Sequence, residues 1–385
     1  MKKLQYPSNI DYSKYSRDAI NNEAFYGLPS NILFCKKCVT VFHKHQVRNK
    51  ILFPKSYHYR SSLTQDVIEG MKLLFQRVKK IKKNIIGRNV LDIGCNDGTL
   101  LEIFKKAGCN TFGVEPTNAA KIAEKKHVIY NDFFNEQLAK KIKKQIKKID
   151  VIVFTNVFAH INNLKTLIKG LRLLIDKDTL IVIENHYLGS VIKRKQFDTF
   201  YHEHPRTYSL TSFLKISELL SLNLTLCEFP KRYGGNIRVF LSKKKSSLSS
   251  KKKFKKITTE EKKYFFEKLK KFQKIVFDWK KQTKTKLVKM SKKYELVGKA
   301  FPGRASILIN LLNINNKTVR RIYEKSDSPK IGHFAPNTNI PIVSDKIIRK
   351  LSKKAIIINF SWHISKEIRS YLNKLNIKNK ILNIL

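Results

Sequence analysis

Three short segments of the chain hold side chains that suit acid–base chemistry. One ends near His160, a second reads Glu-Asn-His-Tyr over 184–187, and a third ends in Tyr-His-Glu-His over 201–204. An imidazole titrates near neutral pH and can take up and return a proton, with carboxyl and phenol groups as partners. We therefore expect proton transfer here. Metal binding through His-x-His and Glu is the rival interpretation, but the spacing matches no standard zinc pattern.

The elements that must position these segments form an alternating series of helices and strands. Apolar residues at helical spacing predict a helix over 66–81. Buried-strand patterns follow at 90–93, 111–116, 128–134, 150–156 and 179–184, with a terminal pair at 222–229 and 236–241. This order predicts a doubly wound α/β sheet, whose ligands bind outside the carboxyl ends of the strands. The three segments lie at those ends.

The first of these strands runs into a glycine turn, which lets a ligand approach bare backbone. The strand carries Asp92, the turn holds Gly94, Asn96 and Gly98, and a helix opens at Leu100. The turn is too short for a Walker loop and lacks the third glycine of the dinucleotide fingerprint. Its pattern of hydrophobic-Asp-hydrophobic-Gly-x-x-x-Gly resembles the first motif of class I S-adenosylmethionine (SAM) methyltransferases.

Acidic residues at the ends of the next two strands fit the same cofactor. Glu115, followed by Pro116, lies about 20 residues after the glycine turn, where a carboxylate accepts hydrogen bonds from both ribose hydroxyls. Asp132 is expected at the adenine amine, with Phe133 or Phe134 beside the ring. The structural alternatives are an acidic helix cap for Glu115 and a buried turn carboxylate for Asp132.

The composition is that of a globular protein with a strongly basic charge. The 385 residues are enough for two or three domains, and 42% hydrophobic with 11% aromatic content excludes global disorder. No apolar run is long enough to span a membrane and the first residues lack a signal-peptide core, so we expect a cytoplasmic protein. The net charge of +50 would suit nucleic acid or an acidic membrane, but lysine is abundant along the whole chain. We therefore expect no specific nucleic-acid partner, and we expect a monomer.

The N-terminal part holds half of a structural zinc site. Cys35 and Cys38 form a Cys-x-x-Cys pair, and His43 and His45 follow. A structural zinc site usually has four ligands, and the sequence has no second cysteine pair. The two histidines could complete a site, although their spacing is short for that purpose. Two reduced thiols without metal are the favoured interpretation, and the odd number of cysteines does not suggest a disulfide framework.

Beyond the predicted sheet the chain is rich in lysine and then returns to an α/β pattern. Residues 243–256 are expected to form a solvated loop, and an apolar stripe predicts a helix over 265–279. A last domain begins near Tyr294. There Arg304 closes a glycine-containing turn before a helix, and the helix N-terminus makes this arginine a candidate phosphate ligand. Two more strands are predicted at 321–324 and 355–360.

Three stretches resemble the SAM-dependent C-methyltransferases of nucleotide-linked keto-deoxysugars: residues 156–161, residues 197–204 and the Gly-Gly-Asn-Ile-Arg turn at 234–238. The resemblance covers nearly the whole chain and implies a class I methyltransferase core with a Rossmann-like domain that helps to bind the nucleotide-sugar. Family members carry an N-terminal zinc module with two cysteine pairs, of which this chain matches one. The expected parts are a degenerate zinc-type module at 1–65, the methyltransferase domain at 66–242, a basic linker and helix at 243–293, and the Rossmann-like domain at 294–385.

The resemblance also implies roles for individual residues. His204 is the implied general base, with Tyr201 near the keto oxygen and Glu203 supporting the site. His160 and His202 are competing bases, and His202 would point to the same side as His204 if this stretch were extended. The other expected site residues are Tyr59 in the active site, Asn156 at both cofactor and substrate, and His160, Tyr187, Arg238 and Arg304 at the substrate.

The implied reaction moves a methyl group from SAM to the carbon beside a sugar ketone, in the biosynthesis of deoxysugars and polysaccharides. The ketone acidifies that C–H bond, a base removes the proton, and the enolate carbon attacks the sulfonium methyl. Methylation of an oxygen or nitrogen of a nucleotide-sugar is the alternative, because a fold does not choose its acceptor. A nucleic-acid methyltransferase is less favoured. Enzymes that methylate an exocyclic amine usually carry Asn/Asp-Pro-Pro-Tyr/Phe after the fourth strand, where this chain has Thr-Asn-Val-Phe at 155–158.

Overall fold

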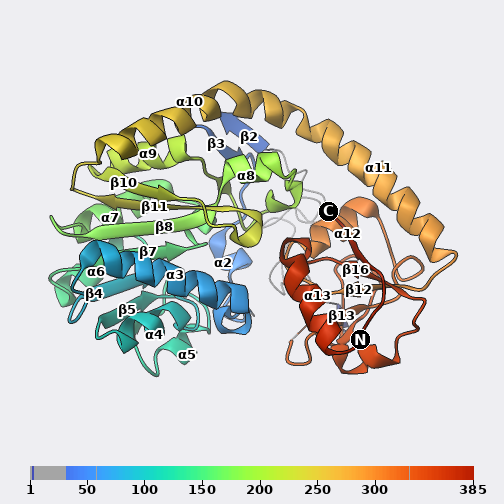
Figure 1. Ribbon diagram of the computed structural model, residues 1–385. Coiled ribbons are helices and arrows are strands. Elements are labelled where there is room, and N and C mark those ends of the chain that lie inside the picture. The colour runs from blue at the N-terminus through green and yellow to red at the C-terminus, as the bar shows by residue number, and fades with distance from the viewer. Residues whose placement is uncertain (1, 4–31, 58, 329) are drawn as a thin grey trace. The chain divides into compact units, whose positions relative to one another are not determined.

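A computed structural model describes residues 2–3, 32–57, 59–328 and 330–385 (Figure 1). Its chain divides into two compact units. We call Ser30–Arg194 with His202–Glu267 the larger unit, and Lys195–Tyr201 with Lys268–Leu385 the smaller unit, to which the N-terminal residues are also assigned. Residues 4–31 of the expected zinc-type module lie outside the described part of the chain.

The larger unit is built on a seven-stranded sheet in the order β10-β11-β8-β7-β4-β5-β6. Neighbouring strands from β8 to β6 run parallel, whereas β11 pairs antiparallel with both β8 and β10. The predicted doubly wound sheet with a terminal strand pair is therefore confirmed, and the pair is antiparallel. The strands are β4 (Asn89–Ile93), β5 (Asn110–Val114), β6 (Val128–Tyr130), β7 (Val151–Thr155), β8 (Leu180–His186), β10 (Asn223–Glu228) and β11 (Asn236–Ser242).

Two apolar cores cover the two faces of this sheet, because successive residues of a strand point to opposite faces. Val90 packs in one core with Leu74 and Phe104, whereas its neighbour Leu91 packs in the other with Phe154. The predicted helix over 66–81 is confirmed as α3, and its buried residues recur at helical spacing. The helices of this unit are α3 (Gln65–Lys82), α4 (Thr99–Lys106), α5 (Ala120–Ala123), α6 (Glu136–Gln145), α7 (Leu164–Leu174), α8 (Leu188–Lys193) and α9 (Leu210–Leu219).

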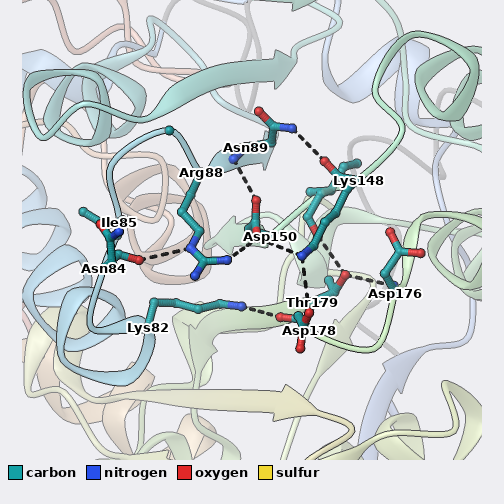
Figure 2. A network of polar contacts seen from close by, with 12 residues as sticks. Lys82, Asn84, Ile85, Arg88, Asn89, Lys148, Asp150, Asp176, Asp178 and Thr179 are labelled. Atoms are coloured by element: carbon teal, nitrogen blue, oxygen red, sulfur yellow. Dashed lines mark hydrogen bonds and ion pairs between the residues drawn. The ribbon is translucent and has the colours of Figure 1, made fainter.

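A polar network joins the amino ends of the central strands (Figure 2). The Asp150 carboxylate accepts from the Arg88 guanidinium at 2.7 Å and from the backbone N–H of Asn89 at 3.1 Å. Thr179 donates to the Ile149 carbonyl at 2.7 Å, which ties the start of β8 to the start of β7. These contacts fix the amino ends of the strands. The candidate site lies at the opposite, carboxyl ends.

The first described residues after the gap fold against the later chain. Strands β2 (Ile32–Cys35) and β3 (Thr40–His43) form a hairpin, and β3 pairs with β9 (Arg206–Thr207). The Thr40 hydroxyl lies 2.8 Å from that of Ser212 on α9. A short helix, α2 (Asn49–Leu52), then leads toward the start of α3. The hairpin is therefore part of the larger unit.

The predicted solvated loop over 243–256 is wrong for its second half, because helix α10 (Leu248–Lys270) begins at Leu248. Phe254 is buried in the core on one face of the sheet, and Ile257 packs against the same core. The many lysines of this segment are compatible with a helix as well as with a loop, because lysine has a high helix propensity. The predicted stripe over 265–279 is divided between α10 and a second helix, α11 (Phe272–Ser291).

The smaller unit contains a five-stranded parallel sheet in the order β15-β13-β12-β16-β17. The strands predicted at 321–324 and 355–360 appear as β13 and β16, and the expected helix after the glycine-containing turn is α12. This is the predicted second α/β fold. Its elements are β12 (Leu296–Lys299), α12 (Ala305–Leu312), β13 (Ile322–Glu324), β15 (Ile342–Ser344), β16 (Ile356–Asn359), α13 (Ser365–Lys374) and β17 (Ile381–Asn383), with β14 (His333–Phe334) pairing with β1 (Lys2–Lys3). Among the described residues, no helix combines the length and apolar content needed to cross a membrane.

Candidate active site

The turn between β4 and α4 has the open backbone that its glycines predict. Gly94, Asn96 and Gly98 have φ angles of +77°, +51° and +80°. A Cβ on Gly94 would lie 2.5 Å from the Val157 side chain, so only glycine fits there. Gly98 is the N-cap of α4. The turn thus offers backbone rather than side chains to a ligand at this strand end.

Glu115 lies beside this turn. Its buried carboxylate accepts from the backbone N–H of Asn96 at 3.0 Å and from that of Thr117 at 2.9 Å. Each carboxylate oxygen keeps a further lone pair, as ribose recognition requires. Pro116 is half-buried between these anchors. The turn and the carboxylate therefore fit the ribose end of SAM.

Asp92, on β4, is almost completely buried, and its Oδ1 has no hydrogen-bond partner among the described residues. Burial, and then the nearby charge of Glu115, raise the pKa of Asp92 to about 8. This carboxyl is therefore mostly protonated at neutral pH and can offer a hydrogen.

Asp132 and Phe133 follow β6, the neighbour of β5 in the sheet. Asp132 is exposed and accepts from the backbone N–H of Phe133 at 2.7 Å, whereas Phe133 is half-buried. The amide of Asn131 donates to the Glu115 carbonyl at 2.7 Å, so the ends of the two strands are tied together. The structural alternative of a buried turn carboxylate does not apply to Asp132.

Three histidines meet at the carboxyl ends of β7 and β8. His160 ends the short turn of helix after β7, His186 is the last residue of β8, and His204 lies in the loop before β9. The His204 ring is 4.9 Å from that of His160 and 5.1 Å from that of His186, measured between centroids. All three predicted segments therefore contribute to one imidazole cluster.

His202 and His160 are the competing histidines. Residues 201–204 form turns rather than a strand, and the His202 ring faces His43 at 5.7 Å. His202 and His204 would point to the same side only in an extended stretch, and this stretch is not extended. Burial lowers the pKa of His160 to about 4, and its Nδ1 has no partner among the described residues.

Tyr59 connects the glycine turn at 94–98, which we call the cofactor turn after the ligand expected there, with the imidazole cluster. Its carbonyl accepts from the side-chain amide of Asn96 at 3.1 Å, and its hydroxyl lies 3.5 Å from that of Tyr233. The Tyr233 ring is in turn 5.7 Å from the His186 ring. A continuous set of contacts therefore runs from the glycine turn to His204.

The residues after Tyr59 close over the same turn. Ser61 donates its backbone N–H to Asn96 Oδ1 at 3.0 Å and its hydroxyl to Asp97 at 2.6 Å. Burial disfavours the Asp97 charge, but hydrogen bonds from Ser61, Thr99 and Ser62 outweigh it and lower the pKa of Asp97. The segment is thereby held against the cofactor turn.

A buried polar network supports the site from β8 and β11. Glu184, fully buried, accepts from Arg238 at 2.6 Å and from the Asn236 amide at 2.9 Å, and Arg232 lies 3.3 Å away. The Asn236 amide also donates to Asn156 Oδ1 at 3.2 Å, and Asn156 has a φ of +56°. Arg238, predicted at the substrate, is buried and supports this network.

Two further predicted residues of the larger unit have protein partners. Glu203 is buried and accepts from the Tyr57 hydroxyl at 3.3 Å. The Tyr187 hydroxyl donates to Glu261 of α10 at 2.9 Å, and its ring packs 4.8 Å from that of Phe229. Tyr187 therefore faces α10, while Glu203 supports the loop that carries His204.

Tyr201 and Arg304 belong to the smaller unit. Arg304, at the N-cap of α12, makes two hydrogen bonds to Asp198, at 2.8 and 3.0 Å, and lies over the Trp362 ring. The Trp362 indole N–H also donates to Asp198, at 2.9 Å. Arg304 Nη1 is buried without a partner among the described residues, so its two N–H groups could donate to a phosphate.

The cysteine pair lies at the turn of the β2–β3 hairpin. Cys35 and Cys38 are half-buried and free, and hydrogen bonding from the Cys38 backbone lowers the pKa of Cys35. In the part of the chain that the structure describes, no group of three or more His, Cys, Asp or Glu side chains could hold a metal ion. These residues do not fit a four-ligand zinc site, and the low zinc content expected from the sequence stays a prediction.

Tyr233 and Tyr57 were not predicted from the sequence as site residues. Tyr57 contacts Glu203 across 146 residues and Tyr233 contacts Tyr59 across 174. The position of Tyr233 directly before Gly234 and Gly235 is the one local signal, because it marks a turn of unusual backbone geometry.

Two family models match the chain, one after the other. A methyltransferase domain matches residues 59–225, and a C-methyltransferase C-terminal domain matches residues 231–381. The first match agrees with the strand order of the larger unit, which is that of the predicted class I fold.

Individual proteins show the same likeness. The C-methyltransferase NovU of Streptomyces niveus is 28% identical over 214 residues, which are 55% of this chain and 51% of that protein. The chain thus matches about half the length of this curated relative. Among solved structures, a magnesium protoporphyrin IX methyltransferase from Synechocystis PCC 6803 is 14% identical with a TM-score of 0.36, over 46% of this chain and 83% of that one. A SAM-dependent methyltransferase from Archaeoglobus fulgidus is 23% identical with a TM-score of 0.33, over 42% and 73%.

The two matched models together span most of the chain, and both name the same chemistry. The chain is therefore similar to C-methyltransferases over most of its length.

Proposed function

We propose that the protein methylates the carbon beside the ketone of a nucleotide-linked keto-deoxysugar, with His204 as general base. The observation that carries the proposal is the set of contacts that links Asn96, in the cofactor turn, to His204 through Tyr59 and Tyr233. C-methylation needs both a methyl donor and a base that acts on carbon. The larger unit has candidates for both within one site.

The larger unit offers SAM a glycine turn and two carboxylates. Gly94 and Gly98 leave the backbone open, Glu115 would accept from the ribose hydroxyls, and Asp132 with Phe133 would meet the adenine. When bound, SAM supplies an electrophilic methyl group on a sulfonium. The chain's own residues must then supply a nucleophilic carbon.

His204 makes that carbon nucleophilic by removing its proton. The C–H electron pair moves into the enolate and then forms the new C–C bond, while the S–CH₃ pair stays on sulfur. The proton held by the imidazole is afterwards released to solvent. The resemblance assigns the base to His204, and the competing His202 faces His43 instead of the imidazole cluster, so we place this step on His204.

The substrate is tested with a panel of nucleotide-linked keto-sugars, SAM and the full chain. We expect mass spectrometry and NMR to show a new methyl group on the carbon beside the ketone. Without SAM turnover, that same carbon should exchange its hydrogen with deuterated water. A methyl group on oxygen or nitrogen would refute C-methylation and favour the alternative acceptor.

The base is tested with His204→Asn. Loss of the imidazole should lower methyl transfer by about 100-fold or more and stop the deuterium exchange, with unchanged SAM affinity by calorimetry. His45→Asn, at an exposed histidine of the same unit, is the matched control and should behave as wild type. Lost transfer with intact exchange would show that another residue removes the proton. Glu115→Ala should instead weaken SAM binding while the protein stays folded.

A further inference from the structure

Tyr233 has a backbone conformation that a bulky side chain rarely adopts. Its φ and ψ are +49° and 27°, in the left-handed region, and it is followed by Gly234 and Gly235 at φ of +83° and +121°. A tyrosine in this region is a true outlier, because its Cβ crowds the backbone there. Such a conformation persists only where the surroundings over-determine it, and it is often found at functional sites.

The surroundings of Tyr233 meet that condition. The Arg232 side chain is anchored to Glu184 at 3.3 Å and to Asp66 at 3.5 Å. It passes so close to Gly70 of α3 that a Cβ there would lie 1.8 Å from the guanidinium. A Cβ on Gly235 would lie 2.4 Å from the Ser190 hydroxyl. Gly70 and Gly235 thus leave room for these side chains, and the buried ion pair between Arg232 and Glu184 holds the turn in place.

The strained turn directs the Tyr233 side chain toward the active site. Its ring faces that of His186 at 5.7 Å and its hydroxyl lies 3.5 Å from the Tyr59 hydroxyl. Tyr59 is itself tied to the cofactor turn through Asn96. The conformation therefore brings two phenols together between the methyl-donor site and the imidazole cluster.

We infer that Tyr233 is a positioning residue for the proposed methyl transfer, whose hydroxyl orients the Tyr59 hydroxyl toward the sugar oxygen that becomes negative in the enolate. This inference rests on the proposed function. A phenol has one hydrogen to donate and can also accept. When Tyr233 donates to Tyr59, the hydrogen of Tyr59 is left for the substrate, where it stabilises the developing charge.

Both phenols stay protonated in this role. Desolvation by the surrounding side chains raises the pKa of Tyr59 well above its usual value. Burial also raises the pKa of Tyr233, although Arg232 opposes the shift. At neutral pH the pair therefore donates hydrogen bonds and does not act as an anion.

The activity test is a double-mutant cycle with Tyr233→Phe and Tyr59→Phe. We expect Tyr59→Phe to lower kcat by about 100-fold and Tyr233→Phe by about 10-fold, with unchanged affinity for SAM. The double variant should be no slower than Tyr59→Phe, because Tyr233 acts through Tyr59. Tyr294→Phe, at an exposed tyrosine, is the matched control and should match wild type.

A second pair of measurements separates positioning from a purely structural role. Tyr233→Asn keeps a residue that tolerates the left-handed turn but removes the phenol, so it should be as slow as Tyr233→Phe. Ultraviolet difference titration should show a higher pKa for Tyr59 in Tyr233→Phe than in wild type, because the hydrogen bond that Tyr233 donates stabilises the Tyr59 phenolate. Wild-type activity in Tyr233→Asn, or additive losses in the double variant, would overturn the inference. If wild type methylates none of the panel, the proposed function fails, while the titration still reports whether the phenols are coupled.

Discussion

At the scale of single residues, Asp92 shows how the cofactor end of the site is charged. Its side chain is buried on β4, Oδ1 has no partner among the described residues, and burial together with Glu115 raises its pKa to about 8. An ionised Asp92 would repel Glu115 across a poorly solvated space. Protonation of Asp92 avoids that repulsion.

The raised pKa of Asp92 makes the stability of the fold depend on pH. Between the ordinary pKa of 3.8 and about 8, folded Asp92 binds its proton more firmly than the unfolded chain does, so stability falls as pH rises through this window. Asp92→Asn removes the contribution. Relative to wild type, the free energy of unfolding of the variant should therefore rise from pH 4 to pH 8, by about 1.4 kcal/mol per pH unit.

Urea unfolding across this pH range measures the difference. Asp327→Asn, at an exposed turn, is the control and should follow wild type at every pH. A gap between Asp92→Asn and wild type that stays constant with pH would contradict the raised pKa. A constant gap would mean that Asp92 titrates normally in the folded protein.

At the scale of elements, the sequence was most informative where local pattern decides structure. The strand at 90–93, the glycine turn after it and the helix over 66–81 appear as predicted, because buried apolar runs and glycines act locally. Helix α10 was partly missed, since its start depends on the burial of Phe254 in a core formed by distant strands. The Tyr59–Tyr233 pair could not be predicted either, because 174 residues separate its members.

One such nonlocal contact attaches α10 to α9. The buried Glu261 carboxylate accepts from the backbone N–H groups of Leu210 and Thr211, at 2.9 and 2.8 Å, and from the Thr211 hydroxyl at 2.6 Å. It therefore caps the N-terminus of α9, where a negative charge is favoured by the helix dipole. The same carboxylate accepts from Tyr187.

Glu261→Gln should destabilise the protein through this cap. The new amide nitrogen cannot accept a hydrogen bond, so at least one buried donor is left unpaired, and the free energy of unfolding should fall by about 1–3 kcal/mol. Glu260→Gln, at the adjacent exposed position, is the matched control and should change stability by less than about 0.5 kcal/mol. Equal stability of the two variants in urea would show that the cap contributes nothing.

At the scale of the whole molecule, the charge is the feature that the site does not explain. The chain has 79 lysine and arginine residues against 29 aspartate and glutamate residues. The arginines of the site network, Arg232 and Arg238, are paired with Glu184, whereas many lysines of α10 and α11 are exposed. The excess charge therefore lies largely on helix surfaces and not in the active site.

Such a surface should bind polyanions such as RNA without sequence specificity. Lysines interact with phosphates as point charges, and the binding free energy comes largely from released counterions. The affinity should therefore fall steeply as the salt concentration rises. We expect two RNAs of unrelated sequence to show equal Kd values by fluorescence anisotropy. Both should lose at least about 100-fold in affinity between about 50 and 200 mM salt. Tight binding of one RNA at physiological salt, with the other unbound, would contradict this expectation, because it would require base-specific contacts. A nucleic acid would then have to be considered as a substrate.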